Sequence, residues 1–279
     1  MNKKQLDFQR NLNETWYWYL TGKHKNGYTR QYEITLNWLY RTSKLVPGSP
    51  RCVECNLPMA GVGSWIMTTR PSNYNPRLCN KCEKALREQE AGAEVELTML
   101  FADVRGSTSL AQTTSTDEFK GIIQRFYRTV TDVLIQHNAL VNRLMGDQVI
   151  GLFVPRFSGP GYTKVAIDAA VDILRATGHA DPAGPWIPVG IGIHTGVAYV
   201  GAVGTPKGVN EIAVLGSAPN LAARLSSQAA DGEVIVSEEA VAAAELTAQG
   251  LEHRTLELKG VDLPVEVGVL RVKGNQASR

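Results

Sequence analysis

The feature that most constrains this chain is a pair of short segments, residues 99–108 and 143–147. Each segment places one aspartate, Asp103 or Asp147, at the end of an apolar run typical of a strand, close to a glycine. Two carboxylates that converge in this way can hold two Mg²⁺ ions, and two such ions allow a hydroxyl to attack a phosphate while pyrophosphate leaves. The segments therefore predict a fold that brings these two strand ends together.

Length and composition exclude several classes of protein. The 279 residues suffice for one sizeable domain and a small one, and 43% hydrophobic residues are ordinary for a globular chain. The formal net charge of +2 gives no case for nucleic acid or an anionic membrane as partner. No apolar run reaches the roughly 18 residues of a transmembrane helix, and the N-terminus has no hydrophobic signal core. We expect a cytoplasmic protein without a membrane partner.

All four cysteines fall within residues 52–82, as two Cys-x-x-Cys pairs, Cys52 with Cys55 and Cys79 with Cys82. This spacing predicts a tetrahedral four-thiolate zinc site. Four thiolates leave no open coordination position, so we expect one structural Zn²⁺ that supplies the folding energy of a small module, residues 51–88. A zinc ribbon that binds nucleic acid is the alternative, which the near-neutral charge disfavours.

Residues 1–50 are expected to form a helical segment that ends at the run Pro47-Gly-Ser-Pro50. Apolar and aromatic residues at roughly helical spacing supply one face of its first helix: Leu6, Phe8, Leu12, Trp16, Tyr19 and Leu20. A second helical run covers residues 34–45. Such stripes are usually core, which favours a helical hairpin packed on its neighbour or on a second subunit. The alternative is a sensor or partner-docking element, for which the sequence identifies no ligand.

Residues 94–273 form the predicted main domain, in which strands and helices alternate. Residues 115–118 are a predicted capping box that opens a long amphipathic helix, and residues 162–176 a second helix. Tight turns at Gly146-Asp147 and Thr195-Gly196 are expected to close two hairpins. The expected strands are 96–103, 140–145, 148–154, 189–194, 197–203, 233–237, 255–259 and 265–272. The order β-α-β-β-α-β, with extra C-terminal elements, predicts an α+β fold with a ferredoxin-like core.

Four motifs in this domain resemble the class III nucleotidyl cyclases, the adenylate/guanylate cyclase family. They are Phe101-Ala-Asp-Val-Arg-Gly-Ser-Thr108, Gly146-Asp147, Gly192-Ile-His-Thr-Gly196 with Gly201, and Gly216-Ser-Ala-Pro-Asn-Leu-Ala-Ala-Arg224. Each motif alone is weak, whereas the four in this order are highly specific. The resemblance covers about residues 94–272. It implies an enzyme that converts a nucleoside triphosphate, ATP by family default, to a 3′,5′-cyclic nucleotide and pyrophosphate.

The resemblance also implies a role for each aspartate. Asp103 and Asp147 match the two metal carboxylates of the family, with the main-chain oxygen of Val104 as a further ligand, and would hold two Mg²⁺ or Mn²⁺ ions on the triphosphate. The turn after the first strand precedes a helix, so its amides and side chains can bind phosphate. The residues of this turn are Arg105, Gly106, Ser107 and Thr108.

Asn220 and Arg224 lie four residues apart and share one helix face. By the resemblance they match the transition-state pair, in which Asn220 orients the ribose and Arg224 stabilises charge on the α-phosphate. In this family the metal carboxylates and this pair come from opposite subunits. One chain that carries all four residues therefore implies a homodimer with two shared sites, whose monomer is inactive.

Two residues depart from the base-recognition pattern of the family's adenylate cyclases. Arg143 and Ala213 stand where a Lys and an Asp or Thr are usual. Arg143 is still a donor, but Ala213 cannot accept a hydrogen bond from an exocyclic amine. A donor without an acceptor suits a base that presents a carbonyl. The expected substrate is therefore ATP or, as the alternative, GTP or a pyrimidine nucleotide, as in anti-phage signalling.

Two phosphate-binding positions of the family fall at Gly190 and Val265, and Arg105 or Lys259 is a candidate to compensate for them. These losses leave open a degenerate cyclase domain that acts as a regulatory nucleotide-binding module. A polymerase-palm or diguanylate-cyclase relative shares the two carboxylates. Such a relative would carry a turn of the Gly-Gly-Asp/Glu-Glu-Phe type, whereas this chain has Leu144-Met-Gly-Asp-Gln148. It would also not require Asn220 and Arg224.

Overall fold

The computed structural model describes residues 3–25, 29, 34, 38, 40–72, 75–88, 91–204, 211–246, 251–261 and 263–272, apart from the side chains of residues 3, 4 and 142–145. The chain divides into two compact units, Met1–Val95 with Tyr199–Leu215, and Glu96–Ala198 with Gly216–Arg279. Within the described residues, no helix combines the length and apolar character needed to cross a bilayer. The two units are described in turn.

The first unit begins with helix α1 (Lys3–Thr21), which buries only its C-terminal half. Trp16 and Leu20 are almost fully buried, whereas Leu6 and Phe8 are 54% and 63% exposed. The apolar face expected for this helix is therefore a core face over its last turns and solvent-exposed over its first ones. The second helical run, expected at residues 34–45, lies largely outside the described residues. The unit also contains two short helices, α3 (Val62–Met67) and α4 (Asn80–Glu88).

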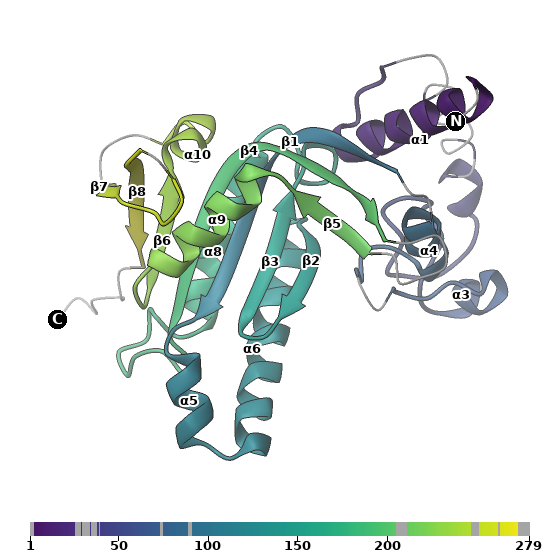
Figure 1. Cartoon of the computed structure of the whole chain (residues 1–279). Helices are drawn as coiled ribbons and strands as arrows, with labels where there is room; N and C mark the ends of the chain where they lie inside the picture. The colour runs from purple at the N-terminus through teal and green to yellow at the C-terminus, as the bar shows by residue number, and fades with distance from the viewer. Residues whose placement is uncertain are drawn as a thin grey trace. The chain divides into compact units, whose positions relative to one another are not determined.

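The sheet brings together strands that are far apart in the sequence (Figure 1). Its order in the described residues is β2-β3-β1-β4-β6-β8-β7, with β5 paired to β4. The strands are β1 (Gly92–Val104), β2 (Leu140–Met145), β3 (Gln148–Phe153), β4 (Val189–Val203), β5 (Glu211–Leu215), β6 (Glu233–Ser237), β7 (Glu252–Leu256) and β8 (Val265–Arg271). The run β2-β3-β1-β4, with a helix after β1 and another after β3, confirms the ferredoxin-like core. Strands β6, β8 and β7 extend this core beyond β4.

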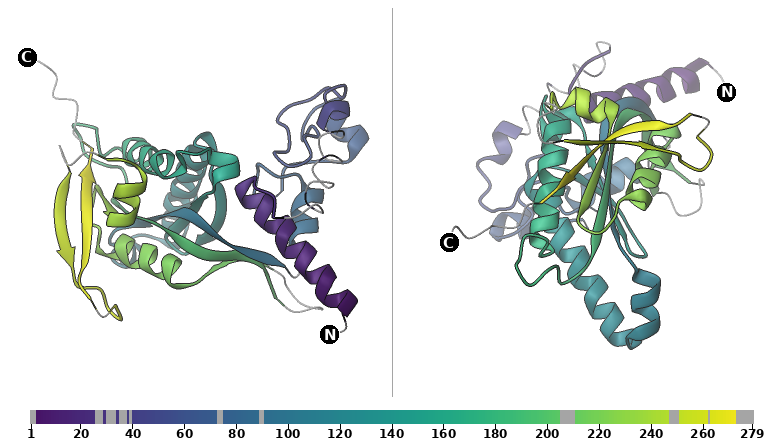
Figure 2. Two further views of the ribbon diagram at one scale, coloured as in Figure 1. Left: turned by 90° about the horizontal axis from the view of Figure 1, so that it is seen from above. Right: turned by 90° about the vertical axis from the view of Figure 1, so that its left-hand side faces the viewer.

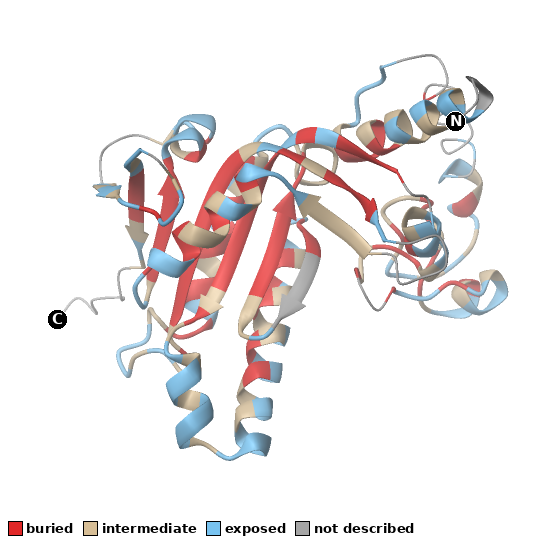
Figure 3. Ribbon diagram, in the orientation of Figure 1, coloured by how far each residue is buried: buried red, intermediate tan, exposed pale blue. Residues whose placement is uncertain are grey.

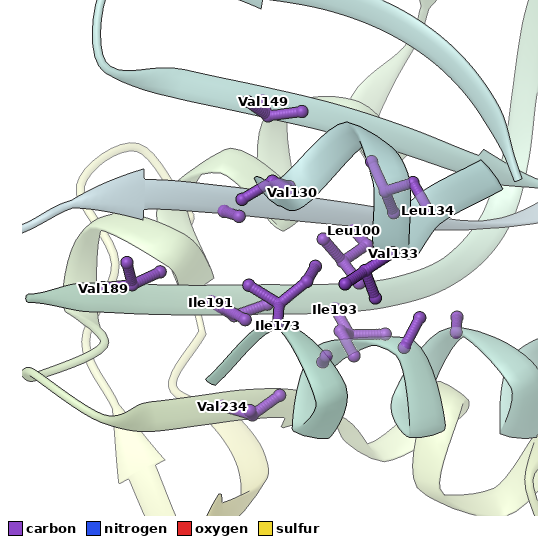
Figure 4. Close-up of a cluster of buried hydrophobic side chains, with 14 of the residues drawn as sticks. Leu100, Val130, Val133, Leu134, Val149, Ile173, Val189, Ile191, Ile193 and Val234 are labelled. Atoms are coloured by element: carbon purple, nitrogen blue, oxygen red, sulfur yellow. The ribbon is translucent and has the colours of Figure 1, made fainter. Parts of the chain in front are cut away.

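Two long helices, α6 (Thr116–Gln136) and α8 (Tyr162–Ala176), cover one face of the sheet, behind it in Figure 1. The expected capping box opens α6: Ser115 Oγ accepts from the Glu118 amide, and the Glu118 carboxylate accepts from the Ser115 amide. Figure 3 shows that the buried residues concentrate in the strands and on the inner sides of these helices. The side chains between the two layers include Leu100, Phe126, Leu134, Ile173 and Ile191, most of which are labelled in Figure 4.

Helix α9 (Ser217–Gln228) lies on the opposite face of the sheet and packs closely on β4. A Cβ atom at Gly192 would lie 2.1 Å from the Ser226 amide nitrogen and 2.6 Å from the Ala222 carbonyl oxygen. Only glycine permits this approach of helix and strand. Gly192 therefore sets the distance between the sheet and α9, the helix that carries Asn220 and Arg224. The two further views in Figure 2 show α9 and α8 on opposite sides of the sheet.

The hairpin expected at Thr195-Gly196 is wrong, because β4 continues without a turn from Val189 to Val203. Thr195 is buried, and its hydroxyl lies 2.8 Å from the Thr98 hydroxyl inside the core. Gly196 is needed for packing, since a Cβ there would lie 2.8 Å from His194 Nε2. The strand that pairs back on β4 is β5, in which Leu215 faces Tyr199. A threonine and a glycine that resemble a turn in sequence thus serve a continuous strand.

The final hairpin also differs from the expected ranges. Strand β7 covers Glu252–Leu256 in place of 255–259, and Arg254 at its centre pairs with the buried Glu233 of β6. Leu258 is 4% exposed and packs with Leu225 of α9, so the chain turns into the core after Leu256. Three short helices complete the second unit: α5 (Ser107–Thr113), α7 (Pro155–Ser158) and α10 (Glu238–Ala243).

Candidate active site

The two aspartates lie at adjacent ends of paired strands. Asp103 is the last but one residue of β1 and faces Gln148, the first residue of β3. Asp147 immediately precedes β3, and its carbonyl oxygen accepts a hydrogen bond of 3.1 Å from the Val104 amide. Leu100, Ala102 and Val104 point into the core under α6 and α8, so Asp103 points to the other face, where α9 lies. The alternation of β1 thus determines which side of the sheet carries this carboxylate.

Each carboxylate has one partner among the neighbouring side chains. The Arg105 guanidinium forms an ion pair with Asp103, and the Ser107 hydroxyl donates to Asp147 Oδ2. The turn that holds Asp147 is fixed by Tyr127, whose hydroxyl donates to the Gly146 carbonyl at 2.5 Å. Burial raises the pKa of Tyr127, and the nearby Asp147 carboxylate raises it further. Tyr127 therefore stays protonated and keeps this hydrogen bond at neutral pH.

The donor set fits a hard divalent cation. Asp103 and Asp147 are both partly exposed, and carboxylate oxygens with a main-chain carbonyl are the ligands that Mg²⁺ and Mn²⁺ take. The Val104 carbonyl lies between the two aspartates in the sequence and at the end of the same strand. The residues expected to bind metal are thus together at one corner of the sheet.

Arg105 is fixed by its backbone and by its side chain. Its amide donates to the Pro188 carbonyl at 2.9 Å. Its Nη1 donates to the Ser227 carbonyl at 3.2 Å and lies 3.4 Å from the Ala229 carbonyl, at the end of α9. Burial lowers the pKa of this guanidinium, while Asp147 and Asp231 act in the opposite direction. The residue stays charged, since arginine keeps its proton under all ordinary conditions.

Arg105 occupies the space that a side chain at position 190 would need. A Cβ atom at Gly190 would lie 3.1 Å from Arg105 Nε and 2.8 Å from the Ala229 carbonyl oxygen. A glycine in one strand and an arginine after the neighbouring strand therefore form a matched pair. This contact between Arg105 and Gly190 is consistent with Arg105 as the candidate that compensates for Gly190.

Asn220 and Arg224 both lie on the outward side of α9, since the buried side of this helix is made by Ala218, Ala222 and Leu225. Asn220 is exposed. Arg224 Nη1 donates to the Gly260 carbonyl at 3.1 Å. Among the described residues of one chain, neither side chain has a hydrogen bond or ion pair to Asp103 or Asp147.

Lys259 precedes the glycine that Arg224 contacts. It lies in the connection between β7 and β8, and it lines a cavity of about 410 Å³ with Leu258, Val261 and Pro264. Val265 begins β8, five residues after Gly260. Of the two positions considered in the final hairpin, Lys259 is the one that adjoins in sequence the glycine whose carbonyl Arg224 contacts.

The two base-recognition candidates lie in different units. The backbone of Arg143 is in β2, opposite Ile150, just after an irregularity in the pairing with β3, and its side chain is outside the described part of the chain. Ala213 is in β5, opposite Gly201 of β4.

The four cysteines meet in the first unit. Their Sγ atoms all lie within 4.8 Å of one another, and Cys82 alone is more than slightly exposed. The Cys79 amide donates to Cys52 Sγ at 3.2 Å, and the Cys82 amide to Cys79 Sγ at 3.4 Å. Hydrogen bonds from the other three thiols hold the pKa of Cys79 well below its usual range. Four converging sulfurs fit a tetrahedral Zn²⁺.

Arg51 holds the first cysteine pair in place. Its guanidinium donates to the carbonyl oxygens of Val46 at 2.6 Å, Asn56 at 2.8 Å and Ser43 at 3.1 Å. Asn56 has a positive φ of 56°, which turns the chain back after Cys55. Backbone carbonyls and one arginine, and not a large apolar core, thus organise this loop.

Residues 90–269 match the model of the adenylate and guanylate cyclase catalytic domain, and the chain therefore belongs to this family. An adenylate cyclase of Mycobacterium tuberculosis is 30% identical over 148 residues, 52% of this chain and 32% of that protein. An uncharacterised protein of the same organism is 30% identical over 188 residues, 65% of this chain and 34% of that protein. The match spans about a third of the length of these relatives.

Solved cyclase domains share the fold. The guanylyl cyclase Cya2 superposes with a TM-score of 0.58 at 25% identity, over 67% of this chain and 97% of that one. The adenylyl cyclase CyaB from P. aeruginosa superposes with a TM-score of 0.56 at 21% identity, over 65% and 97%. Both adenylyl and guanylyl cyclases thus have this architecture, so the fold by itself does not select the base.

Proposed function

We propose that this protein is a metal-dependent nucleotidyl cyclase that converts a nucleoside triphosphate, ATP by family default, to a 3′,5′-cyclic nucleotide and pyrophosphate. The ribose 3′ oxygen bonds to the α-phosphorus, the bond from the α-phosphorus to the bridging oxygen breaks, and the 3′ proton leaves to solvent. The observation that carries the proposal is the meeting of Asp103 and Asp147 at paired strand ends, next to Arg105 and Ser107.

Asp103, Asp147 and the Val104 carbonyl are the residues that would hold two Mg²⁺ or Mn²⁺ ions. Such ions acidify a hydroxyl and neutralise the triphosphate. Arg105, Gly106, Ser107 and Thr108 would bind phosphate oxygens, since they supply a guanidinium, two hydroxyls and amides around the same corner. Lys259 adds a second cation from the final hairpin. These two cations compensate for Gly190 and Val265.

Asn220 and Arg224 would complete the site of a partner subunit, where Asn220 orients the ribose and Arg224 stabilises the charge on the α-phosphate. Their outward position on α9, without a bond to the carboxylates of their own chain, supports a homodimer with two shared sites. Ala213 offers no acceptor to an exocyclic amine, so a GTP or pyrimidine cyclase is the second candidate. Arg143 would then serve as the donor to a base carbonyl.

The cysteine cluster would hold one structural Zn²⁺ and so fold the module of residues 51–88. Intracellular nucleoside triphosphates and reduced thiols both favour a cytoplasmic location. The test of the activity is incubation with Mn²⁺ and an equimolar mixture of the four ribonucleoside triphosphates, followed by mass spectrometry of products and a pyrophosphate assay. A cyclic nucleotide with matching pyrophosphate supports the proposal and names the base. No release from any of the four would favour a regulatory nucleotide-binding module.

A further inference from the structure

Arg105 has two competing uses in the site. In the structure its guanidinium forms an ion pair with Asp103, a carboxylate assigned to metal, although Arg105 itself is assigned to phosphate. A divalent cation and a guanidinium compete for the same carboxylate charge. Both side chains are about four-fifths buried, with 20% exposure for Arg105 and 19% for Asp103. Reduced solvent screening makes such a pair costly to break unless each partner gains another one.

We propose that Arg105 exchanges partners during binding. It closes on Asp103 when no cation is present, and it turns to the triphosphate when a divalent cation takes Asp103. This inference rests on the proposed function of the site. It makes metal and triphosphate bind weakly alone and tightly together, and the coupling is reciprocal, since each ligand must raise the affinity for the other by the same factor.

The surroundings of Arg105 permit the exchange without moving the backbone. Nη1 is anchored on the Ser227 and Ala229 carbonyls, which lie at the end of α9 and belong to neither ligand. Nε is buried and, among the described residues, has no hydrogen-bond partner, so this N–H group of the guanidinium is not used by the protein. Gly190 places no side chain against Nε, where a Cβ atom would lie 3.1 Å from it. The guanidinium can therefore pivot about its Nη1 anchor while Nη2 leaves Asp103.

The first test measures binding of Mn²⁺ alone, by electron paramagnetic resonance of free Mn²⁺, to the zinc-loaded full chain. Arg105→Met keeps the unbranched stem and removes the charge. It should tighten Mn²⁺ binding about fivefold or more, the lower range of typical coupling. Arg175→Ala breaks an exposed arginine–aspartate pair on α8, with Nη1 2.8 Å from Asp172 Oδ1, and should leave Mn²⁺ binding unchanged. Unchanged Mn²⁺ affinity in Arg105→Met would overturn the exchange.

The second test measures binding of inorganic triphosphate, by calorimetry, in buffer freed of divalent cations. Asp103→Asn and Asp147→Asn each remove one negative charge from the same corner, but only Asp103→Asn releases Arg105. We expect Asp103→Asn to bind triphosphate at least about fivefold more tightly than Asp147→Asn. Equal affinities would overturn the exchange. This comparison does not depend on whether Arg105→Met folds. Where Arg105→Met does fold, the double variant Asp103→Asn/Arg105→Met should lose the increase in triphosphate affinity.

The two proposals fail in different ways. If Asp103→Asn and Asp147→Asn leave Mn²⁺ binding as in the wild type, the metal site itself is wrong and the exchange falls with it. If both variants weaken Mn²⁺ binding, but Arg105→Met does not tighten it, the metal site stands and only the partner exchange is overturned.

Discussion

The two candidate metal sites of this chain differ in what holds their ligands together. Asp103 and Asp147 lie at the ends of paired strands, and the buried faces of these strands belong to a core shared with α6 and α8. The four cysteines lie in a stretch whose helices, α3 and α4, are short. Core packing therefore positions the carboxylates before any metal arrives, whereas the cysteine module is expected to depend on the ion that we propose it holds. The same kind of ligand loss should inactivate one site and unfold the other.

The largest effect is expected from Cys79→Ser. Structural Zn²⁺ contributes on the order of 10 kcal/mol to folding in small zinc modules, so residues 51–88 should lose zinc and become open to proteolysis. The measurements are zinc content by mass spectrometry and limited proteolysis with identified cut sites. Ser64→Ala alters an exposed hydroxyl of the same module, which donates to the Gly61 carbonyl at 2.7 Å, and should keep the zinc. A Cys79→Ser protein that keeps full zinc and full protease resistance would contradict the comparison.

Asp103→Ala should have the opposite effect from Cys79→Ser, with a loss of activity and no loss of zinc. We expect turnover to fall by about 10³-fold or more, because the metal ligand set is broken, while zinc content stays unchanged. The melting temperature should fall by several degrees, because the partly buried Arg105 guanidinium loses its ion-pair partner, but the domain should stay folded. Asp168→Ala removes an exposed carboxylate on α8 and serves as the matched control. Retained turnover in Asp103→Ala would place the catalytic metals elsewhere.

Arg224→Ala should lower turnover by about 10²–10³-fold without affecting either metal site. Because its site would be shared between subunits, co-expression with Asp103→Ala should restore about a quarter of wild-type activity: half of the dimers are mixed, and each has one intact site. Co-expression of Arg224→Ala with Asn220→Ala should restore nothing, since both changes hit the same half of each site. Equal recovery in the two mixtures would argue against a shared site.

The smallest effect concerns Glu233, a buried carboxylate that pairs with Arg254 and Arg271. Burial raises its pKa, but hydrogen bonds from Arg254, the Ala230 amide and Arg271 outweigh burial and leave the pKa below its usual range. A carboxylate of this kind stabilises the fold above its unfolded-state pKa of about 4.3, and its contribution disappears as the pH falls through the lower folded-state pKa.

Glu233→Gln should therefore cost about 1–2 kcal/mol at neutral pH, and less as the pH falls below about 4. Urea unfolding at several pH values measures this. Glu266→Gln removes an exposed carboxylate of the same sheet, which accepts from Thr255 Oγ1 at 2.6 Å, and should cost little at any pH. A pH-independent cost of Glu233→Gln would show that the carboxylate charge is not what stabilises the sheet.

Local patterns predicted the parts of this molecule in which a short stretch decides the structure. The capping box at Ser115 and the turn before β3 need only neighbouring residues, and both lie where expected. The turn predicted at Thr195-Gly196 was wrong because the role of these residues depends on α9 and on Thr98, which are distant in the sequence. The contact of Arg105 with Gly190 was equally beyond a local pattern, since it joins the ends of two separate strands.

Two strands belong to both compact units. β1 passes from the first unit into the second after Val95, and β4 passes back after Ala198. At the crossing, Gly92 and Gly201 approach so closely that a Cβ on Gly201 would lie 2.4 Å from the Gly92 Cα. To transfer this catalytic domain to another protein, the chains must therefore be joined upstream of Ala91, with Tyr199–Leu215 carried along. A cut at the apparent boundary would sever the longest hydrogen-bonded ribbons of the protein rather than a linker.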